Sequence, residues 1–502
     1  MKLPLLGGDT REYSRHISNT LTQNLYPHVA EDGLSLYPFP GSSLWRTTSS
    51  NNIVRQFAVY RAFVNAAPSL SFQNYLFSIE GSSVIAYDAA GTVRDSGSIE
   101  STSGPVYLLP GQATAANNAL LIIDGKNAPA LPGMYYINCQ GSAPFVPSAT
   151  DADFPINASV GDVLDGYFIV NANTELQPNR FYVSDLKNCT SWSALSFAEK
   201  VSDFTKIQQI KRLGNKIFIF GEDTTEIWVN IRNPDFPFQK QDPATMSYGI
   251  AAPNSAVVID NIMYWITKSR TTSPKIVKSS GGMVDSISTP GVDRFLETNI
   301  ISDAKAWPVF FSGHRWYLVT FPSGSRTYVY DVDLKMWFTI KHLNYDKYNV
   351  GAYIYFEGKH LVADSESNRI LMLDENVYTN NGQIIERVRR TQFINIDNLI
   401  LHYKFVELEF EVGVGNATAA DPKVFLRWSD DGGNSWSGPI SRSLGAQGKY
   451  KTIVRVQGRL LGASRNRQFE ISVTDPVKCV LKRAFADVSV EVSKLDQKKT
   501  ED

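Results

Sequence analysis

A short hairpin-like unit returns along most of this chain and restricts the folds open to it. Each copy has a short apolar strand, a polar turn and a second β-rich strand that often ends in Asp or Asn, as in NKIFIFGEDTTEIWVN. Apolar and polar residues alternate within the copies, which is typical of strands with one face in a core. The seven copies begin near Asn74, Ala119, Gly166, Asn215, Asn261, Arg315 and Lys359.

The spacing of these hairpins predicts the architecture. Successive copies start about 44 to 54 residues apart, a period found in repeat arrays and propellers. One hairpin cannot bury its apolar face alone, and radial stacking of four-stranded sheets leaves only short, protected edges. We therefore predict an all-β chain whose residues 54–385 form a β-propeller with seven blades, six being the alternative count. A pair of β-sandwiches whose strand spacing imitates a repeat is the competing interpretation.

The segments on either side of the repeat differ from it in character. Residues 1–53 contain Pro27 and Pro40, which forbid a continuous helix and favour extended backbone, so they predict an extended N-terminal arm. Residues 386–492 hold longer strand-like runs, enough for a C-terminal antiparallel β-sandwich. Residues 493–502 are charged and have nothing to bury, which predicts a disordered tail.

The charge balance excludes whole classes of function. The 502 residues carry 49 Lys and Arg against 50 Asp and Glu, a formal net charge of −1. A general basic surface for DNA is therefore not expected, because sequence-independent affinity comes from neutralising phosphates. No apolar run reaches the roughly 18–20 residues of a membrane span, and the first residues lack the apolar core of a signal peptide. We expect a soluble chain made in the cytoplasm.

The sequence has no motif for a metal, a cofactor or catalysis. Its 3 Cys and 6 His show neither CxxC nor HExxH spacing. No GxxxxGK[ST] loop, GxSxG elbow or GxGxxG after a strand is present. The acidic pairs Asp223 with Glu226 and Asp331 with Asp333 fall in predicted turns, where Asp is favoured for its backbone hydrogen bonds. We predict no metal site, no cofactor and no catalytic residue.

The sharpest local pattern is SDDGGNSWS, in which Ser429, Asp431, Gly433 and Trp436 match S-x-D-x-G-x-x-W. It resembles the Asp-box, a hairpin of sialidases and of many unrelated β-proteins. The Asp and Ser side chains of such a box bond backbone amides of the turn, the glycines supply positive φ, and the Trp packs beneath. The box occurs once and outside the repeat, whereas a sialidase would repeat it on several blades. We therefore predict a structural role for it.

Basic residues cluster where the predicted propeller ends, at Arg387, Arg389 and Arg390. Two interpretations are open for this cluster: contact with DNA phosphates or an acidic partner surface, or a solvated strand face with interface ion pairs. The sequence does not separate the two. A second, looser basic set comprises Arg455, Arg459, Arg465 and Arg467.

Several stretches, in their order along the chain, resemble the packaged-DNA stabilisation proteins that form the tail hub, or nozzle, of short-tailed (podovirus-type) bacteriophages. GYFIVNANTELQPNRFYVSDLKNCTSWSALSFAEK resembles the family segment in which a strand pair ends in F-x-x-S-D-L and an S-A-x-x-x-A-E-like run follows. IQQIKRLGNKIFIFGEDTTEIW, YGIAAPNSAVVIDNIMYWIT and VFLRWSDDGGNSWS resemble, in turn, a later strand pair, the start of the next blade and the closing domain. The resemblance extends over roughly residues 30 to 490.

The resemblance implies a non-enzymatic structural protein of the virion tail, assembled in the cytoplasm of the bacterial host. It implies a ring of copies, expected to be a homohexamer, that docks below the portal and its adaptor (head-to-tail connector) protein. Such a ring would retain the packaged DNA, contact it transiently as the genome ejection channel, and anchor a tail needle, tailspikes or fibres, without inserting into a membrane. A net charge near zero fits a conduit that DNA must leave quickly.

A carbohydrate-binding or glycan-degrading β-propeller tail component is the alternative function. Such a component would bind sugars through exposed aromatic side chains, for which Trp192, Trp228 and Trp316 are the candidates. Each tryptophan also has the plainer interpretation of packing between blades. A glycan array without hits would exclude this alternative.

Overall fold

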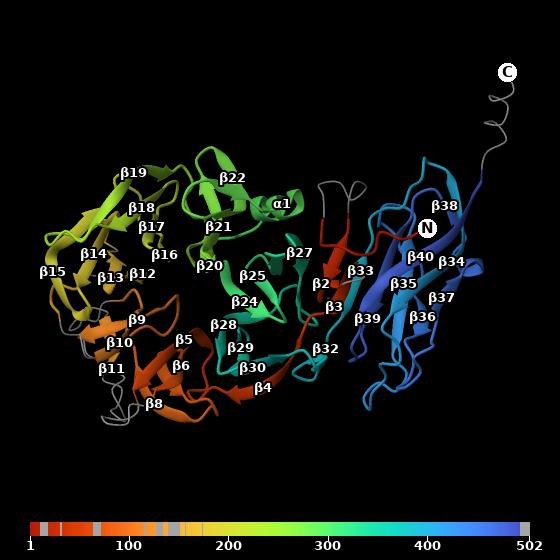
Figure 1. The fold of residues 1–502 in the computed structure, drawn as a ribbon, viewed down its shortest axis with the longest axis horizontal. Helices are drawn as coiled ribbons and strands as arrows, with labels where there is room; N and C mark the ends of the chain where they lie inside the picture. Colours follow the sequence, from red (N-terminus) through yellow and green to blue (C-terminus); the bar gives the residue numbers. More distant parts are fainter. Residues whose placement is uncertain are drawn as a thin grey trace, which may run out of the picture.

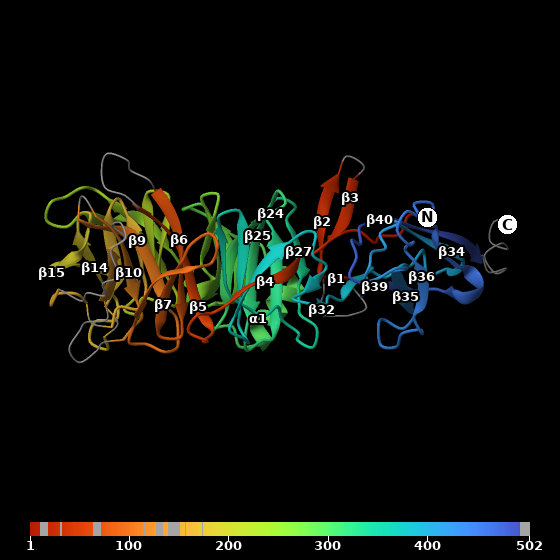
Figure 2. The ribbon, with the colours of Figure 1, turned by 90° about the horizontal axis from the view of Figure 1, so that it is seen from below.

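The molecule is elongated, with a ring of small antiparallel sheets at one end and a β-sandwich at the other (Figures 1 and 2). It is seen in a computed structural model that describes residues 1–10, 19–30, 33–63, 72–114, 117–126, 134–138, 151–155, 157–172 and 174–491. Within these residues the chain is mostly strand, with one α-helix, α1 (Pro290–Thr298), and two 3-10 helices, η1 (Pro253–Ser255) and η2 (Gly458–Leu460). None of the described helices is long or apolar enough to cross a membrane.

The ring is a propeller of seven blades. Blades 1 to 3 contain β5 (Val54–Phe63), β6 (Phe72–Glu80), β7 (Ser83–Tyr87) and β8 (Val93–Ser98); β9 (Tyr107–Thr114), β10 (Asn117–Ile123) and β11 (Met134–Asn138); and β12 (Gly161–Leu164), β13 (Tyr167–Asn171), β14 (Arg180–Asp185) and β15 (Asn188–Glu199). Blades 4 and 5 contain β16 (Gln209–Leu213), β17 (Lys216–Phe220), β18 (Thr225–Asn230) and β19 (Phe238–Met246); and β20 (Val257–Ile259), β21 (Ile262–Ser269), β22 (Thr272–Ser279) and β23 (Val284–Ser286). Blades 6 and 7 contain β24 (Lys305–Phe311), β25 (His314–Phe321), β26 (Arg326–Asp331) and β27 (Met336–Thr339); and β28 (Val350–Phe356), β29 (Lys359–Asp364) and β30 (Arg369–Asp374).

Each predicted hairpin is the central strand pair of one blade, from β6 and β7 in blade 1 to β29 and β30 in blade 7. The central strands are buried on both faces because each blade packs between two neighbours; in β17, Ile217, Phe218 and Ile219 are at most 1% exposed. The innermost strand of blade 7, β28, lies against the innermost strand of blade 1, β5, and this contact closes the circle. The predicted all-β propeller is confirmed, and the competing pair of sandwiches is not observed.

The N-terminal segment differs from the expected extended arm, because its short strands join sheets of the same chain. It forms β1 (Leu21–Gln23), the hairpin of β2 (Leu25–Ala30) with β3 (Gly33–Pro38), and β4 (Gly41–Thr47). β4 pairs antiparallel with β30 and is the outermost strand of blade 7, so the N-terminal segment completes the last blade. Tyr26 and Phe39 are buried in the core between blades 6 and 7. Strands this short cannot stand alone, but an existing sheet edge satisfies their backbone groups.

The C-terminal region forms the predicted β-sandwich. One sheet contains β33 (Arg387–Arg390), β39 (Gln468–Val473), β35 (Lys423–Ser429) and β36 (Ile440–Ser443); the other contains β3, β40 (Leu481–Glu491), β34 (Ile400–Phe410) and β37 (Val454–Gln457), with β38 (Ala463–Ser464) beside β34. β31 (Thr379–Asn380) and β32 (Gln383–Ile384) lead into it from blade 7. Leu3 and Leu5 are buried in its core with Val406 and Phe469. The predicted disordered tail, 493–502, lies outside the described residues.

We expect Gly41→Ala to destabilise the propeller by about 3 kcal/mol. A methyl group on Gly41 would lie under 3.0 Å from the carbonyl oxygens of Val377 and Thr379, so β4 would have to move away from the segment that leads out of blade 7. Gly282→Ala is the matched control, because a methyl group there meets nothing within 4 Å. The free energy of unfolding from urea titration checks this, and equal values for the two variants would contradict it.

We expect acid to destabilise the fold through His342, which is 7% exposed and packs edge-on against Tyr348. Burial lowers the pKa of His342 to about 4 from its ordinary 6.5. Between these two values the unfolded chain binds a proton that the folded chain does not, so stability falls as the pH falls, by up to about 3 kcal/mol.

Unfolding free energies measured between pH 7.5 and 4.5 should therefore decline less steeply for His342→Gln than for the wild type. His402→Gln, at an exposed position of β34, is the control and should keep the wild-type slope. A His342→Gln variant that retains the full decline would contradict the assignment.

Candidate functional site at the junction of propeller and sandwich

A three-residue strand of the N-terminal segment joins the propeller to the sandwich. β1 pairs in parallel with β27 of blade 6 through Gln23 and Thr339, and antiparallel with β33 on its other side. The result is one nine-stranded sheet, in the order β24, β25, β26, β27, β1, β33, β39, β35, β36. Figure 2 shows β1 at the boundary between the two halves of the molecule. We call the region around β1 and β33 the junction.

Asn24 ends β1 and fixes its place. Its φ of +54° lies in the left-handed region, which asparagine tolerates better than most residues. Its backbone N–H donates to the carbonyl of Thr339 at 2.9 Å, and its side-chain oxygen accepts the backbone N–H of Lys341 at 2.9 Å. Its side-chain amide donates to the carbonyl of Glu386 at 2.8 Å. One short side chain therefore binds the segment that follows the last strand of blade 6 and the residue that precedes β33.

Arg389, one of the three arginines of the basic cluster, is buried inside the junction and is 2% exposed. Its guanidinium donates to the carbonyl oxygens of Leu5 and Gly8 and to the hydroxyl of Thr22. Burial lowers the pKa of Arg389 to about 10, against an opposing effect of Asp9, so the group stays charged at neutral pH. The charge holds the N-terminal segment against β33.

Arg387 also faces the interior, because residues two apart on a strand share a face. It is 1% exposed and donates to the carbonyl oxygens of Tyr378 at 3.0 Å and Asp475 at 3.3 Å. The sequence left two interpretations open for the three arginines, contact with DNA or a partner or a solvated strand face, and neither describes Arg387 and Arg389, whose charged groups bind within the chain. Contact with DNA or a partner stays a prediction for Arg390.

Arg390 belongs to a second network, which includes the tryptophan of the Asp-box. Its Nε and Nη2 donate to one carboxylate oxygen of Glu470 at 2.9 and 2.7 Å, and Arg427 Nε donates to the other oxygen at 2.6 Å. Both guanidinium groups lie over the ring of Trp436, at 4.9 and 5.0 Å from its centre. Glu470 is 4% exposed, so the two arginines compensate a charge that would otherwise be buried alone.

The Asp-box residues form a tight turn next to this network. Asp431 Oδ1 accepts the backbone N–H of Ser435 at 2.9 Å, and the Ser429 hydroxyl accepts that of Gly433 at 2.8 Å. The hydrogen bonds from Ser435, with smaller effects from other turn groups, hold the pKa of Asp431 well below its usual range. Trp436 is half-exposed and does not reach the sandwich core. It covers the two arginines and their shared carboxylate, where the sequence placed it beneath the turn.

The looser basic set divides in a similar way. Arg467 is 2% exposed and donates to both carboxylate oxygens of Asp430, at 2.6 and 2.7 Å. Arg455 pairs with a carboxylate of the neighbouring strand. Arg459 and Arg465 are exposed. Only the last two present their charges fully to solvent.

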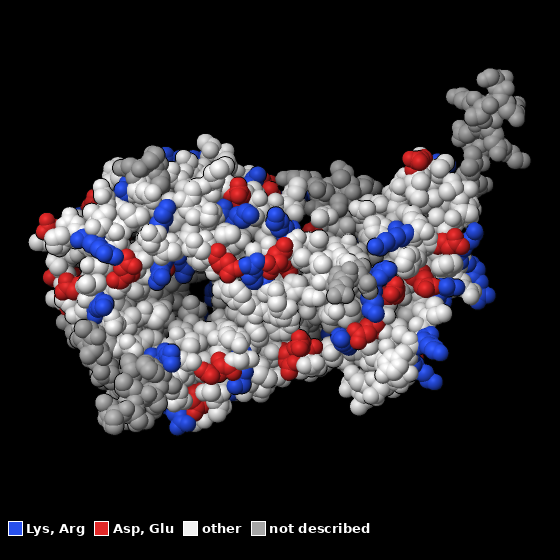
Figure 3. Space-filling view, in the orientation of Figure 1, with Lys and Arg blue, Asp and Glu red and all other residues white. Residues whose placement is uncertain are grey.

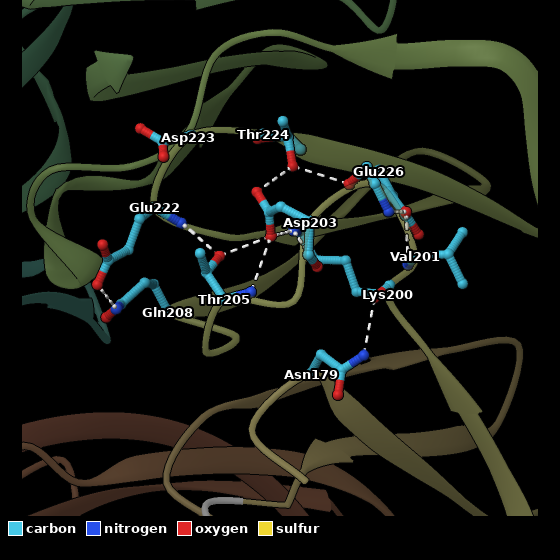
Figure 4. A network of polar contacts seen from close by, with 12 residues as sticks. Asn179, Lys200, Val201, Asp203, Thr205, Gln208, Glu222, Asp223, Thr224 and Glu226 are labelled. Atoms are coloured by element: carbon cyan, nitrogen blue, oxygen red, sulfur yellow. Dashed lines mark hydrogen bonds and ion pairs between the residues drawn. The ribbon is translucent and has the colours of Figure 1, made fainter. Parts of the chain in front are cut away.

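The acidic pair Asp223 and Glu226 is not arranged for acid–base chemistry. Figure 4 shows Asp223 pointing away from Glu226. Asp223 forms an exposed ion pair with Arg270 at 2.7 Å, whereas Glu226 is fully buried and accepts the backbone N–H of Val201 at 2.9 Å. Both carboxylates stabilise turns or blades. Among the described residues no group of three or more His, Cys, Asp and Glu side chains could hold a metal ion.

Figure 4 also shows a buried ion pair between Lys200 and Asp203, in the connection from blade 3 to blade 4. Asp203 further accepts the hydroxyl groups of Thr205 at 2.6 Å and Thr224 at 2.5 Å. Burial alone would raise the pKa of Asp203, but the hydrogen bonds from these three side chains together hold it below its usual value. The pair fastens two neighbouring blades, and sequence analysis did not single it out.

The tryptophans named for sugar binding are not exposed. Trp192, Trp228 and Trp316 are 5%, 8% and 0% exposed. The indole N–H of Trp316 donates to Asp331 at 3.1 Å, and Asp331 also accepts the backbone N–H of Asp333 at 3.0 Å, as a turn carboxylate does. The assignment of these rings as sugar-binding platforms is wrong, because they pack between strands and blades.

Comparison with known families gives two matches that together span both halves of the molecule. A model described as "Bacteriophage P22 Gp10, beta-propeller" matches residues 1–378. A model described as "Bacteriophage P22 Gp10, beta-sandwich" matches residues 386–489. None of the curated proteins matches this chain.

Three of the solved structures that match this chain are distant from it in sequence. The Pan2 WD40 domain of Neurospora crassa has 9% identity and a TM-score of 0.39, over 66% of this chain and 93% of that one. The N-terminal domain of Nup159 has 10% identity and a TM-score of 0.38, over 70% and 98%. An extracellular domain of the two-component system BT4673 of B. thetaiotaomicron has 10% identity and a TM-score of 0.40, over 80% and 47%.

We expect Arg389→Met to loosen the N-terminal segment and to cost about 3 kcal/mol, because it leaves buried carbonyl oxygens without a donor. Limited proteolysis with mass spectrometry should then detect cleavage before residue 24 in the variant, together with a lower melting temperature. Arg459→Met, at an exposed position of the same domain, is the matched control. Identical cleavage and melting in the two variants would contradict the role given to Arg389.

Proposed function

The chain belongs to the family of the bacteriophage P22 Gp10 protein, a structural component of the phage tail hub that stabilises packaged DNA, and on this premise we propose how it acts. Copies of the chain form a ring, expected to be a homohexamer, that docks below the portal and its adaptor protein. The ring retains the packaged genome, serves as the ejection channel, and anchors the tail needle and the tailspikes or fibres. It acts as a structural part of the virion, without catalysing a reaction.

The observation that carries this proposal is the nine-stranded sheet that continues from blade 6 into the sandwich through β1. A part that holds a packaged genome has to transmit force without its domains moving apart. β1 is hydrogen-bonded to a strand on each side, and buried charged groups fasten it from the interior. A flexible linker would let propeller and sandwich move independently, whereas this connection favours a rigid hub.

The distribution of charge supports a ring closed by head-to-tail contacts. Residues 386–492 contain 16 Lys and Arg against 12 Asp and Glu, whereas residues 54–385 contain 26 against 31. The two halves of an elongated molecule therefore carry opposite excess charge. Complementary charge orients partners and suppresses wrong contacts, and head-to-tail contacts close into a ring where the rotation permits.

A phage with a nonsense mutation in this gene tests the proposal. Particles grown without suppression should show heads that package DNA and then lose it, with tails missing below the adaptor, when scored by negative-stain microscopy. Growth in a suppressor host is the control and should restore full, tailed particles. Full, tailed particles that fail only to adsorb to cells would overturn the proposal and favour a receptor-recognising component.

A further inference from the structure

Two adjoining hollows lie among the inner strands of the propeller and share part of their lining. Their volumes are about 630 and 1020 Å³. Strands β5, β9, β12, β16, β20, β24 and β28, one from each blade, contribute to the first. Figure 3 shows a hollow in the propeller face with Lys and Arg side chains near it. Both hollows share the lining residues Arg55, Pro105, Tyr107, Asn254, Lys305 and Gly351, which we call the neck.

The lining of this channel is basic although the propeller as a whole is acidic. Three aspartates face the channel, and each accepts a backbone N–H, as Asp162 does from Arg212 at 2.8 Å. Among the described residues no lining cation forms an ion pair with a carboxylate. The cations are Arg55, Lys126, Lys206, Lys211, Arg212 and Lys305, and the acids are Asp124, Asp162 and Asp303. The six cations outnumber the three aspartates, so the described lining keeps an excess of positive charge.

Arg55 supplies a fixed positive charge at the neck. Its guanidinium donates five hydrogen bonds, all to oxygens of Gly81 and of the loop from Ser101 to Gly104. Every N–H of the side chain is thus used, and the group cannot turn to follow a ligand. Its charge forms no ion pair within the described chain, although Asp124 lies close enough to act on it electrostatically.

Lys305 lies beside Arg55 at the beginning of β24, and its ammonium has no hydrogen-bond partner among the described residues. Burial and, to a smaller extent, the nearby Arg55 lower the pKa of Lys305, and the carboxylate of Asp303 opposes this without reversing it. Such a pair of cations costs free energy unless an anion lies close to it. The ammonium is a compact donor that is free to reach one.

A chain of hydrogen bonds orients the side-chain amide of Asn254 at the neck. Gln209 Nε2 donates to the hydroxyl of Tyr107 at 3.1 Å and to the carbonyl of Pro253 at 2.8 Å. The Tyr107 hydroxyl in turn donates to Asn254 Oδ1 at 2.7 Å, which fixes the orientation of that amide. The NH₂ group of Asn254 then has no partner among the described residues, and η1, which carries it, contacts β24. Asn254 and Lys305 therefore offer unused donors to the same neck.

We propose that the propeller channel binds a small oxyanion of the phosphate type at the neck, with Lys305 and the Asn254 amide as direct donors and Arg55 as the fixed charge beside them. The exposed cations at the mouths, among them Lys206 and Arg212, draw the anion in. This site is separate from the junction and does not depend on the role of the protein in the tail.

The donor set favours phosphate over a carboxylate. Arg recognises carboxylates with its planar fork, but the fork of Arg55 is fully used by backbone and hydroxyl oxygens. What remains is a lysine ammonium acting as a point charge, a neutral amide and an excess of positive charge, which suits a compact anion with more than one negative charge. Hollows of this size admit a small molecule and exclude duplex DNA.

Isothermal titration of the full chain with inorganic phosphate, in chloride buffer of fixed ionic strength, tests the proposal. The wild type should bind about one phosphate per chain, and Lys305→Met should weaken binding at least about tenfold. Lys335→Met, which removes an exposed lysine in the turn between β26 and β27, is the matched control and should bind as the wild type does. Melting temperatures without phosphate establish that both variants are folded.

If Lys305→Met does not fold, Asn254→Leu and Lys211→Gln should each weaken phosphate binding by a smaller factor. A parallel titration with ADP distinguishes the source of the anion: tighter binding than phosphate, with the same dependence on Lys305, supports a nucleotide, and equal or weaker binding supports free phosphate. Absence of saturable phosphate binding by the wild type, or equal binding by Lys305→Met and Lys335→Met, would overturn the proposal.

Discussion

The pairing of β1 with two strands at once is the interaction on which the rest of the molecule depends. Without Leu21 to Gln23, blade 6 would end in an open edge at β27 and the sandwich would begin with another at β33. Exposed edges bind other chains indiscriminately. One short strand removes both edges and makes two domains into one body. Its own sequence is unremarkable, because a strand that is paired on both sides gains its stability from its neighbours.

The same N-terminal segment ties the beginning of the chain to its end. Lys2 forms a bridge with Phe485, β1 binds the junction, and β4 closes blade 7 against β30. The last blade and the sandwich are therefore incomplete until segments hundreds of residues apart have met. Pairing at such separations is slow because loop closure precedes the contacts that stabilise it. The closed propeller and the joined sandwich thus form as a consequence of long-range pairing, not of local hairpin strength.

The sequence predicted the hairpins, which form between neighbouring residues, and missed the pairings between segments far apart in the chain. Period-two alternation found the central hairpin of each blade, because those strands are buried whichever way the blades are arranged. It could not find β4, whose partner in blade 7 lies more than 300 residues away. The sequence shows the basic cluster at 387–390. Which of its arginines face the interior follows only when strand alternation is combined with the position of β1. The signal that was overlooked is Glu470: an acid inside the apolar strand QFEISV requires buried cations, and Arg390 and Arg427 are those cations.

The net charge of −1 conceals three separate electrostatic arrangements. At the junction, the arginine side chains donate their hydrogen bonds to carbonyl oxygens and to Glu470. They therefore make the junction rigid and add little to the electrostatic field outside the protein. On the sandwich, Arg459 and Arg465 face solvent. In the propeller channel, an excess of cations persists inside an acidic domain. Density of basic residues in the sequence is therefore a poor guide to binding here. The densest cluster is the least accessible, whereas the channel cations come from blades 1, 2, 4 and 6 and from the connection between blades 3 and 4, and meet only in the closed ring.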